Sequence, residues 1–283
     1  MVSVMWLMNI PILSVNHPAT LSAVLKNSNV KGSFMLKQIR PWIGNGLLTS
    51  SGKQWHRNRR LLTPAFHQDL LKRYVEVKNR CADILVHKFE KAAEADTCVE
   101  AFLAVGMCVL DILLKCAMTY ETDCQLLGSK HPYVEATSKI QDIMGTRFFQ
   151  PWLHNDFLFS LTPSGRKFFE HCNFVHQVAE TIINKRQAEM DYATQKSPGQ
   201  GEKKRRCLDL LDVLLTAKTK DGSTLSFSEI RDEVDTFLFT GYDSGTSAIS
   251  WALYSIAQHP KIQSRVQEEI DSVLNHSDHT DVK

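Results

Sequence analysis

The sequence predicts a mainly α-helical chain with a few short strands near its N-terminus. Apolar residues recur at helical spacing in every long segment. Runs that alternate apolar and polar residues, as half-buried strands do, are nearly absent. The chain has 283 residues, of which 43% are hydrophobic, so it can bury a sizeable core as one large domain or two small ones.

The overall charge limits the class of binding partner, and the cysteine usage indicates the cellular compartment. The formal net charge is only +2, so the composition does not favour nucleic acid as a partner. The seven cysteines are irregularly spaced and form no C-x-x-C pair. This usage is typical of free thiols on the reducing side of a cell.

The N-terminal elements are expected to be short. Residues 1–13 are apolar, but a membrane span needs about 20 residues. No basic segment precedes them and no small-residue cleavage site follows. We therefore predict neither an anchor nor a signal peptide here. We expect a strand at about 10–15, a helix from about Pro18, and a second short strand at about 47–50.

Helical patterns continue through the middle of the chain. Residues 68–93 have an apolar face opposite a polar one. Residues 101–119 are apolar nearly all round, which predicts a helix that is buried on every side. Further helices are predicted over about 129–148, from the N-cap and first-turn proline of Thr162-Pro163 to about Met190, and over about 208–218.

Residues 192–206 form the clearest surface linker. They combine proline, glycine and glutamine with a basic run. The basic run is open to two functional interpretations, a membrane-surface patch or a nuclear signal, but a solvated loop is favoured. A turn is predicted at 220–223.

The most informative element is a long helix over about 227–258. Ser226 and Glu229 form a capping-box pattern at its start, and His259-Pro260 ends it and opens another helix. A helix of about 32 residues is about 48 Å long, against a mean of about 11 residues. Because it is also apolar, it must cross the middle of the molecule.

Polar and small residues interrupt the centre of this helix. Gly241 and Gly245 are four residues apart and share a face, which Ser244 and Ala248 continue. Each glycine costs about 1 kcal/mol relative to alanine, and such local departures tend to mark functional sites. The pattern predicts a shallow groove for a flat ligand. Asp243 beside Ser244 would form a short proton relay there.

Three other interpretations of this centre remain open. The Gly-x-x-x-Gly spacing could let another helix cross closely. Residues 237–257 could instead be a membrane span with a dimer motif, although Asp243 near its centre would cost about 2.5–3.5 kcal/mol. Ser244 could simply donate a hydrogen bond to the carbonyl of Thr240.

A second cluster lies in residues 53–67, KQWHRNRRLLTPAFH. Trp55 and Arg59 are four apart and share a helix face. An indole N–H and a guanidinium that point the same way form a suitable clamp for a carboxylate. The alternative is a basic surface helix that uses Trp55 as its core anchor.

Together these segments resemble the cytochrome P-450 haem-thiolate monooxygenases. The resemblance is closest to their fourth family, which includes fatty-acid and eicosanoid ω-hydroxylases. PWIGNGLLTSSGKQWHRNRRLLTPAFH is similar to the segment before and through that family's C helix, and RDEVDTFLFTGYDSGTSAISWALYSIAQHP is similar to its long I helix. LTPSGRKF and LDLLDVLLTAK match segments in between.

The resemblance implies a fold and a set of site residues. Residues 1–283 would be one partial cytochrome P-450 domain, with a C helix at about 53–63 and an I helix at about 227–258. The implied roles are haem-propionate binding by Trp55 and Arg59, contact with the porphyrin by Gly241, Gly245 and Ala248, proton delivery by the acid–alcohol pair Asp243 and Ser244, and substrate contact by Phe237 and Thr240.

The resemblance also implies a cofactor and partners. Thr240 replaces a glutamate that links covalently to the haem in many fourth-family members, so haem b is expected to bind non-covalently. Electrons would come from NADPH through NADPH–cytochrome P-450 reductase. The substrate would be lipid-like, with no role for nucleic acid. The family's place is the cytosolic face of the endoplasmic reticulum membrane, and we expect no anchor segment in this chain.

The sequence departs from the family pattern in several places. Thr240-Gly241-Tyr242-Asp243-Ser244-Gly245 stands where the family has Glu-Gly-His-Asp-Thr-Thr, and Ser244 lacks the methyl group that restricts a threonine rotamer. No cysteine has the context Phe-x-x-Gly-x-x-x-Cys-x-Gly of the axial ligand. Cys207, which follows the basic run, lacks that loop, and the only Glu-x-x-Arg match, Glu202 to Arg205, sits in the linker.

We therefore expect the N-terminal and middle part of a monooxygenase, stopping just after the I helix and inactive by itself. Two alternatives belong to other classes. One is a non-catalytic fragment that binds other proteins. The other is a helical membrane protein that uses residues 237–257 as a span.

Overall fold

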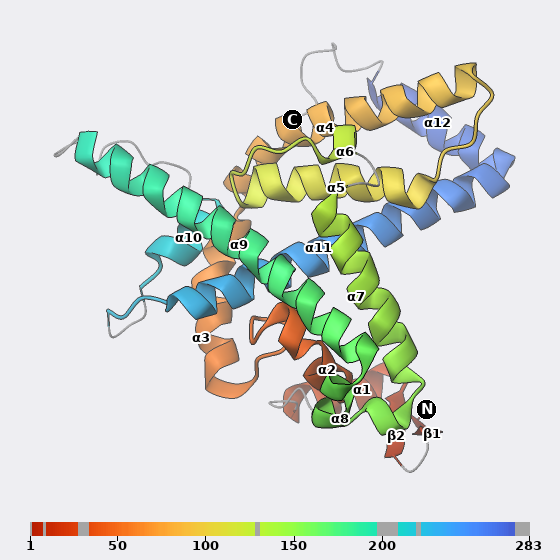
Figure 1. Ribbon diagram of the computed structural model, residues 1–283. Helices are drawn as coiled ribbons and strands as arrows, with labels where there is room; N and C mark the ends of the chain where they lie inside the picture. The colour runs from red at the N-terminus through yellow and green to blue at the C-terminus, as the bar shows by residue number, and fades with distance from the viewer. Residues whose placement is uncertain are drawn as a thin grey trace.

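The computed structural model describes residues 2–7, 10–27, 34–127, 131–196, 209–218 and 222–274. Helices make up nearly all of its regular structure, which confirms the mainly α class (Figure 1). The elements are β1 (Val2–Leu7), β2 (Ile10–Val15), α1 (Pro18–Asn27), α2 (Phe34–Ile43), α3 (Gly52–Leu62), η1 (Thr63–Phe66), α4 (Gln68–Glu94), α5 (Ala101–Ala117), α6 (Cys124–Leu127), α7 (Pro132–Phe148), η3 (Pro151–Leu153), α8 (Asp156–Leu161), α9 (Pro163–Lys196), α10 (Leu210–Thr216), α11 (Phe227–Gln258) and α12 (Pro260–Leu274).

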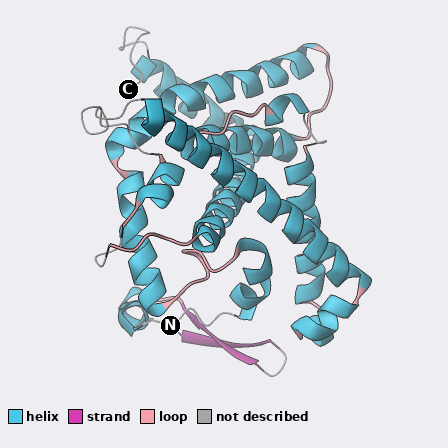
Figure 2. Cartoon of the chain, turned by 60° about the vertical axis from the view of Figure 1, so that its left-hand side comes forward, coloured by secondary structure: helices cyan, strands magenta, loops and turns pink. Residues whose placement is uncertain are grey.

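The two strands form one antiparallel hairpin at the edge of the molecule (Figure 2). Val2 pairs with Val15 and Leu7 with Ile10, so the strand expected at about 10–15 is confirmed. The strand expected at 47–50 is wrong, because the amides of Thr49 and Ser50 both donate to the carbonyl of Gly46, at 3.1 and 2.9 Å. That segment is therefore a turn. Among the described helices, none has the length and apolar character that crossing a membrane requires.

Helix α11 runs through the middle of the fold and packs along α5, with further contacts to α2 and α9 (Figure 1). The predicted capping box is present at its start. The amide of Glu229 donates to Oγ of Ser226 at 3.3 Å, and the amide of Ser226 donates to Oε2 of Glu229 at 2.9 Å. The helix ends at Gln258, and Pro260 begins α12, as the sequence predicts.

The core lies where α5, α7, α9 and α11 meet. Every residue of α5 from Ala104 to Asp111 is buried, which confirms most of the expectation for that segment, although Phe102 at its start is 45% exposed. Leu110 of α5, Ile183 of α9 and Val234 of α11 are fully buried in the same cluster. The apolar face of each helix is thus covered by the others, and burial of this kind is the main stabilising contribution.

Helix α9 is the longest element and spans the molecule diagonally in Figure 1. Oγ1 of Thr162 accepts from the amide of Gly165 at 2.9 Å, so the predicted N-cap is confirmed. The helix continues past Met190 to Lys196. Its Arg186 binds both carboxylate oxygens of Asp212 in α10, at 2.7 and 2.9 Å. The predicted linker beyond Lys196, with Glu202, Arg205 and Cys207, and part of the turn at 220–223 lie outside the described residues.

A buried ion pair ties α2, α9 and α11 together. Nδ1 of His176 in α9 lies 2.6 Å from Oδ2 of Asp235 in α11, and its Nε2 lies 3.0 Å from the carbonyl of Pro41 in α2. The Asp235 side chain is fully buried and that of His176 is 17% exposed. The three helices are therefore joined by one imidazole ring as well as by apolar packing.

Candidate active site on helix α11

One face of α11 carries four of the nine candidate site residues that the sequence singled out. Glu233, Phe237, Thr240, Ser244 and Ala248 follow one another at intervals of three or four residues, so they share this face. Glu233 is fully buried, Phe237 and Thr240 are half-buried, and Ser244 and Ala248 are exposed. The face is covered where the helix begins and becomes open towards its C-terminal half. We call the part from Thr240 to Ala248 the open face.

The segment before α3 and α3 itself cover the beginning of this face. Nδ2 of Asn58 donates to Oε1 of Glu233 at 2.7 Å, and the amide of Leu47 donates to its Oε2 at 3.0 Å. Arg57 pairs with Glu229 one turn earlier. Burial raises the pKa of Glu233, and these two hydrogen bonds only partly offset that effect. The position of α3 along α11 is therefore fixed by buried polar contacts.

Trp55 and Arg59 lie on the arm formed by α3 and η1. The bounds of α3 agree with the helix expected at about 53–63. Trp55 is half-buried and Arg59 is exposed, and the guanidinium of Arg59 makes no ion pair with the residues that the structure describes. At the end of the arm, the ring of Phe66 lies 5.7 Å from the ring of Phe237. The arm thus runs from the buried Glu233 to the edge of the open face.

The two central glycines of α11 face α5. A Cβ atom on Gly241 would lie 2.7 Å from Cδ2 of Leu113, and one on Gly245 would lie 3.2 Å from Cγ1 of Val109. Helix α5 thus occupies the space beside both glycines, although Gly241 also lines an apolar pocket, and the expected groove for a flat ligand stays a prediction. At about 100° per residue, Gly245 lies well round the helix from Thr240. The close helix crossing, left open as an alternative, accounts for both glycines.

An apolar pocket of about 170 Å³ borders the open face. It lies between η1, α4, α5 and α11 and brings Phe237, Thr240 and Gly241 together with Phe66. The remaining lining is almost entirely apolar: Ala65, Leu71, Tyr74, Leu113, Ala117, Met118, Leu210 and Leu238. Such a pocket suits part of an alkyl chain.

Asp243 and Ser244 do not contact each other through their side chains. Oδ1 of Asp243 accepts from Nε2 of Gln141 in α7 at 2.8 Å. Oγ of Ser244 donates to the carbonyl of Thr240 at 2.6 Å, and Oγ1 of Thr240 donates to that of Thr236 at 2.8 Å. The back-bonding of Ser244 that the sequence left open is thus present. Gln141 carries no signal in the sequence that could have linked it to Asp243.

An open groove reaches the contact between Gln141 and Asp243 from outside. It has a volume of about 590 Å³ and lies between the start of α5, α7 and α11. Its lining includes Gln141 and Tyr242 with the charged residues Glu100, Glu135 and Lys139. Water can therefore approach α11 on the side where Asp243 contacts Gln141, which is not the open face.

The cysteines of the described residues do not resemble an axial haem ligand. Five of them are buried, and Cys98 is exposed. Burial raises the pKa of Cys108 and Cys116 to about 11 and that of Cys124 to about 12, so these groups stay protonated thiols. No group of three or more potential metal ligands occurs in the ranges that the structure describes. None of the cysteines that the structure describes is therefore a candidate for the thiolate ligand of a haem.

Comparison with known proteins agrees with this arrangement. A family model described as Cytochrome P450 matches residues 2–283. The chain is 36% identical over 268 residues to cytochrome P450 4F2 of Homo sapiens, covering 93% of this chain and 51% of that protein. It is 38% identical over 259 residues to cytochrome P450 4A11 of Homo sapiens, covering 91% and 49%. It is 35% identical over 260 residues to the taurochenodeoxycholic 6 alpha-hydroxylase of Sus scrofa, covering 92% and 51%.

The fold is also that of a solved relative. The crystal structure of the cytochrome P450 CYP102L1 superposes with a TM-score of 0.76 at 18% identity, covering 96% of this chain and 59% of that chain. The chain spans about half the length of the curated relatives it matches. The resemblance to the fourth family that the motifs indicated is confirmed, and the chain belongs to the cytochrome P450 family.

Proposed function

We propose that this chain is part of a haem-dependent monooxygenase that hydroxylates fatty acids or related lipids. The observation that carries the proposal is the open face of α11, in a chain that belongs to the cytochrome P450 family. A haem, when bound, supplies the iron at which dioxygen is activated. One relative is named as a taurochenodeoxycholic 6 alpha-hydroxylase, which supports hydroxylation of a lipid-like substrate. Electrons would come from NADPH–cytochrome P-450 reductase at the endoplasmic reticulum membrane.

The haem would lie against the open face, without a covalent link. Thr240 and Ala248 would contact it from α11, and a threonine hydroxyl takes the place of the glutamate that could form an ester. Trp55 and Arg59 would hold a propionate, and this role is supported by the exposed guanidinium of Arg59, which makes no ion pair with the described part of the chain. A hydrogen bond to a charged group contributes about 1.5–3 kcal/mol. Phe237 and Thr240 would border the substrate, as their place in the apolar pocket supports.

Proton delivery would use Asp243 and Ser244. Gln141 holds the Asp243 carboxylate beside a groove that water can enter, which supports Asp243 as the group that takes up the proton. Ser244 now donates to the Thr240 carbonyl. Because serine lacks the threonine methyl, its Oγ can turn between staggered rotamers and carry the proton towards the open face. General acid–base steps of this kind contribute about 100- to 10,000-fold.

The test uses the chain extended by a C-terminal segment of a relative that contains the axial cysteine. Asp243→Asn should slow hydroxylation by about 100- to 10,000-fold, and Ser244→Ala should also slow it, while both variants keep substrate affinity. Asp271→Asn on the exposed helix α12 is the matched control and should leave turnover unchanged. Equal turnover in Asp243→Asn and the parent would show that this carboxylate is structural.

A second candidate function is the binding of another protein without catalysis. It is favoured by the apolar side chains exposed on the last turns of α11 and on α12, namely Ile249, Trp251, Leu253, Tyr254, Ile262, Val266, Ile270 and Val273. Large exposed apolar patches favour association. We expect the 283-residue chain alone to show no turnover even with the reductase, whereas the extended chain turns over. Absence of turnover in a folded, haem-loaded extended chain would instead favour the binding function.

A further inference from the structure

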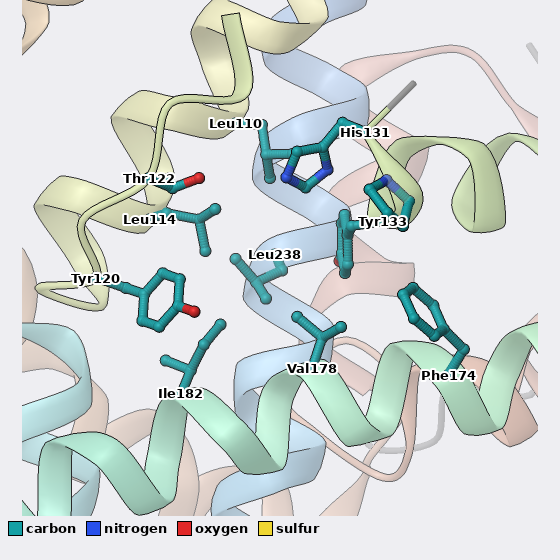
Figure 3. A pocket seen from close by; sticks show the side chains of 11 residues that line it. Leu110, Leu114, Tyr120, Thr122, His131, Tyr133, Phe174, Val178, Ile182 and Leu238 are labelled. Atoms are coloured by element: carbon teal, nitrogen blue, oxygen red, sulfur yellow. The ribbon is translucent and has the colours of Figure 1, made fainter. Parts of the chain in front are cut away.

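A separate cavity of about 220 Å³ lies inside the helical core (Figure 3). Its walls come from α5, the segment after it, the start of α7, α9 and α11. The lining residues are Leu110, Leu114, Tyr120, Thr122, His131, Pro132, Tyr133, Phe174, Val178, Ile182 and Leu238. Leu110, Ile182 and Leu238 are at most 1% exposed, so the floor of the cavity belongs to the core.

This cavity is distinct from the open face and the pocket beside it. Leu238 is the one residue that lines both pockets. Two residues along a helix correspond to a rotation of about 200°, so Leu238 points nearly opposite to Thr240. The candidate active-site residues on α11 therefore do not take part in this cavity, and a molecule in it would not contact Ser244.

Buried polar atoms without partners occur in the cavity wall. Tyr133 is 4% exposed, and its hydroxyl makes no hydrogen bond with the residues that the structure describes. Nδ1 of His131, two residues earlier, is also buried and has no hydrogen-bond partner among the described residues. Figure 3 shows the hydroxyls of Tyr120 and Thr122 directed into the same space. Because buried polar groups nearly always have a partner, the Tyr133 hydroxyl and Nδ1 of His131 point to something that occupies the cavity.

The lining defines the chemical class of that occupant. None of the described residues that line the cavity has a charged side chain, so a neutral molecule fits best. Burial lowers the pKa of His131, which keeps its ring neutral, with one nitrogen a donor and the other an acceptor. A ligand hydroxyl can donate or accept and thus suits either tautomer. A cavity of about 150 Å³ lined by leucine, isoleucine and phenylalanine can hold benzene, so this larger cavity can hold a substituted ring.

We propose that the cavity binds one compact, neutral aromatic alcohol of about the size of phenol. Its ring would pack on Leu110, Leu114 and Ile182, and its hydroxyl would face Tyr133 and His131. Water alone is the competing occupant, since ordered waters also satisfy buried polar groups. A water-filled cavity would show no preference for an aromatic ring.

The experiment is calorimetric titration of the 283-residue chain with phenol and with toluene, which has nearly the same shape but no hydroxyl. We expect phenol to bind more tightly than toluene by about 2- to 12-fold, the value of one neutral hydrogen bond. Tyr133→Phe should reduce this preference and leave toluene affinity unchanged. Because that change removes an unpartnered hydroxyl, it should not impair folding.

Two further variants complete the design. Val178→Phe should abolish binding of both probes by filling the cavity. Tyr254→Phe, an equal change at an exposed site on α11, should alter neither affinity. Lack of phenol binding at millimolar concentration, or phenol binding that survives both Tyr133→Phe and Val178→Phe unchanged, would overturn the proposal. The measurement needs neither haem nor turnover, so its result is independent of the proposed catalytic function.

Discussion

Replacing His176 by alanine tests how much the buried pair with Asp235 contributes to holding three helices together. Both ring nitrogens of His176 face acceptors, at 2.6 Å from Asp235 and 3.0 Å from the Pro41 carbonyl, so the fold favours the doubly protonated, positively charged ring. The variant leaves a fully buried carboxylate without its counter-ion. Removing one partner of a buried pair costs about 3–5 kcal/mol. Since His176 is 17% exposed, we expect about 3 kcal/mol.

The pH dependence of this contribution follows from the direction of the pKa shifts. Burial disfavours the charged ring of His176, but the hydrogen bond and charge of Asp235 outweigh it, so its pKa is raised above the ordinary 6.5. Burial also raises the pKa of Asp235, so the folded pair keeps a proton that the unfolded chain loses. The stabilisation is complete below pH 6.5 and is lost as the pH rises through the folded pKa. In that pH window, the contribution to the free energy of unfolding falls by at most about 1.4 kcal/mol per pH unit.

Urea unfolding at about pH 6, 7 and 8 measures both quantities. The free energy of unfolding of the parent should fall over this window more steeply than that of His176→Ala. A second change, Asp235→Asn, should recover part of the loss by removing the buried charge. His171→Ala, on the same helix and half-buried, is the control and should cost less than about 1 kcal/mol. A cost below about 1 kcal/mol for His176→Ala at pH 6, or identical slopes, would refute the reasoning.

Two further predictions concern glycines and an arginine, all measured by the same unfolding assay. In Gly145→Ala of α7, the added Cβ meets no atom within 4 Å, so the variant should be more stable by about 0.5–1 kcal/mol. In Gly165→Ala, the added Cβ would lie 1.9 Å from the Phe159 carbonyl oxygen, so the variant should be less stable by at least about 1–3 kcal/mol. Equal stabilities of these two variants would contradict the packing described at the start of α9. Arg186→Lys cannot keep the bidentate contact with Asp212 and should lower the free energy of unfolding by about 1.5–3 kcal/mol. An unchanged midpoint of urea unfolding would show that this pair is not stabilising.

The elements that could be predicted from the sequence are those with local signals at both ends. Helix α11 begins and ends as predicted because the capping box of Ser226 and Glu229 and the sequence His259-Pro260 act through neighbouring residues only. The same holds for Thr162 at the start of α9. Long amphipathic segments such as α4 were predicted for the same reason, since their periodicity repeats over many turns.

The elements that were missed depend on distant partners. Helix α2 contains Pro41, which reads as a helix breaker, and it is held by His176 from far along the chain. The sequence around Leu47 predicts a strand, but the amide of Leu47 donates a hydrogen bond to Glu233 in α11 and not to a neighbouring strand. Short helices such as α8, with six residues, are too short to show a helical periodicity in the sequence.

Prediction of the candidate site was limited in the same way, because it too depends on distant partners. Periodicity placed Gly241, Gly245, Ser244 and Ala248 on one face but could not tell which face of α11 remains open. The spacing of Gly241 and Gly245 fits a ligand groove and a helix crossing equally well, and the position of α5 beside them could not be read from it.

Glu233 of α11 holds α3 in place, and its spacing from the open face has a consequence for insertions and deletions. Glu233, which binds Asn58, and Ser244 are separated by eleven residues (244 − 233), which is close to three full helical turns and about 16 Å. One extra residue between them would turn Ser244 to where Gly245 now faces Val109, and one fewer would turn it to where Asp243 now meets Gln141. Either change would carry the hydroxyl off the open face while every side chain stayed the same. The length of this stretch is therefore constrained as strictly as its composition, and only changes by whole turns would keep the two ends in phase.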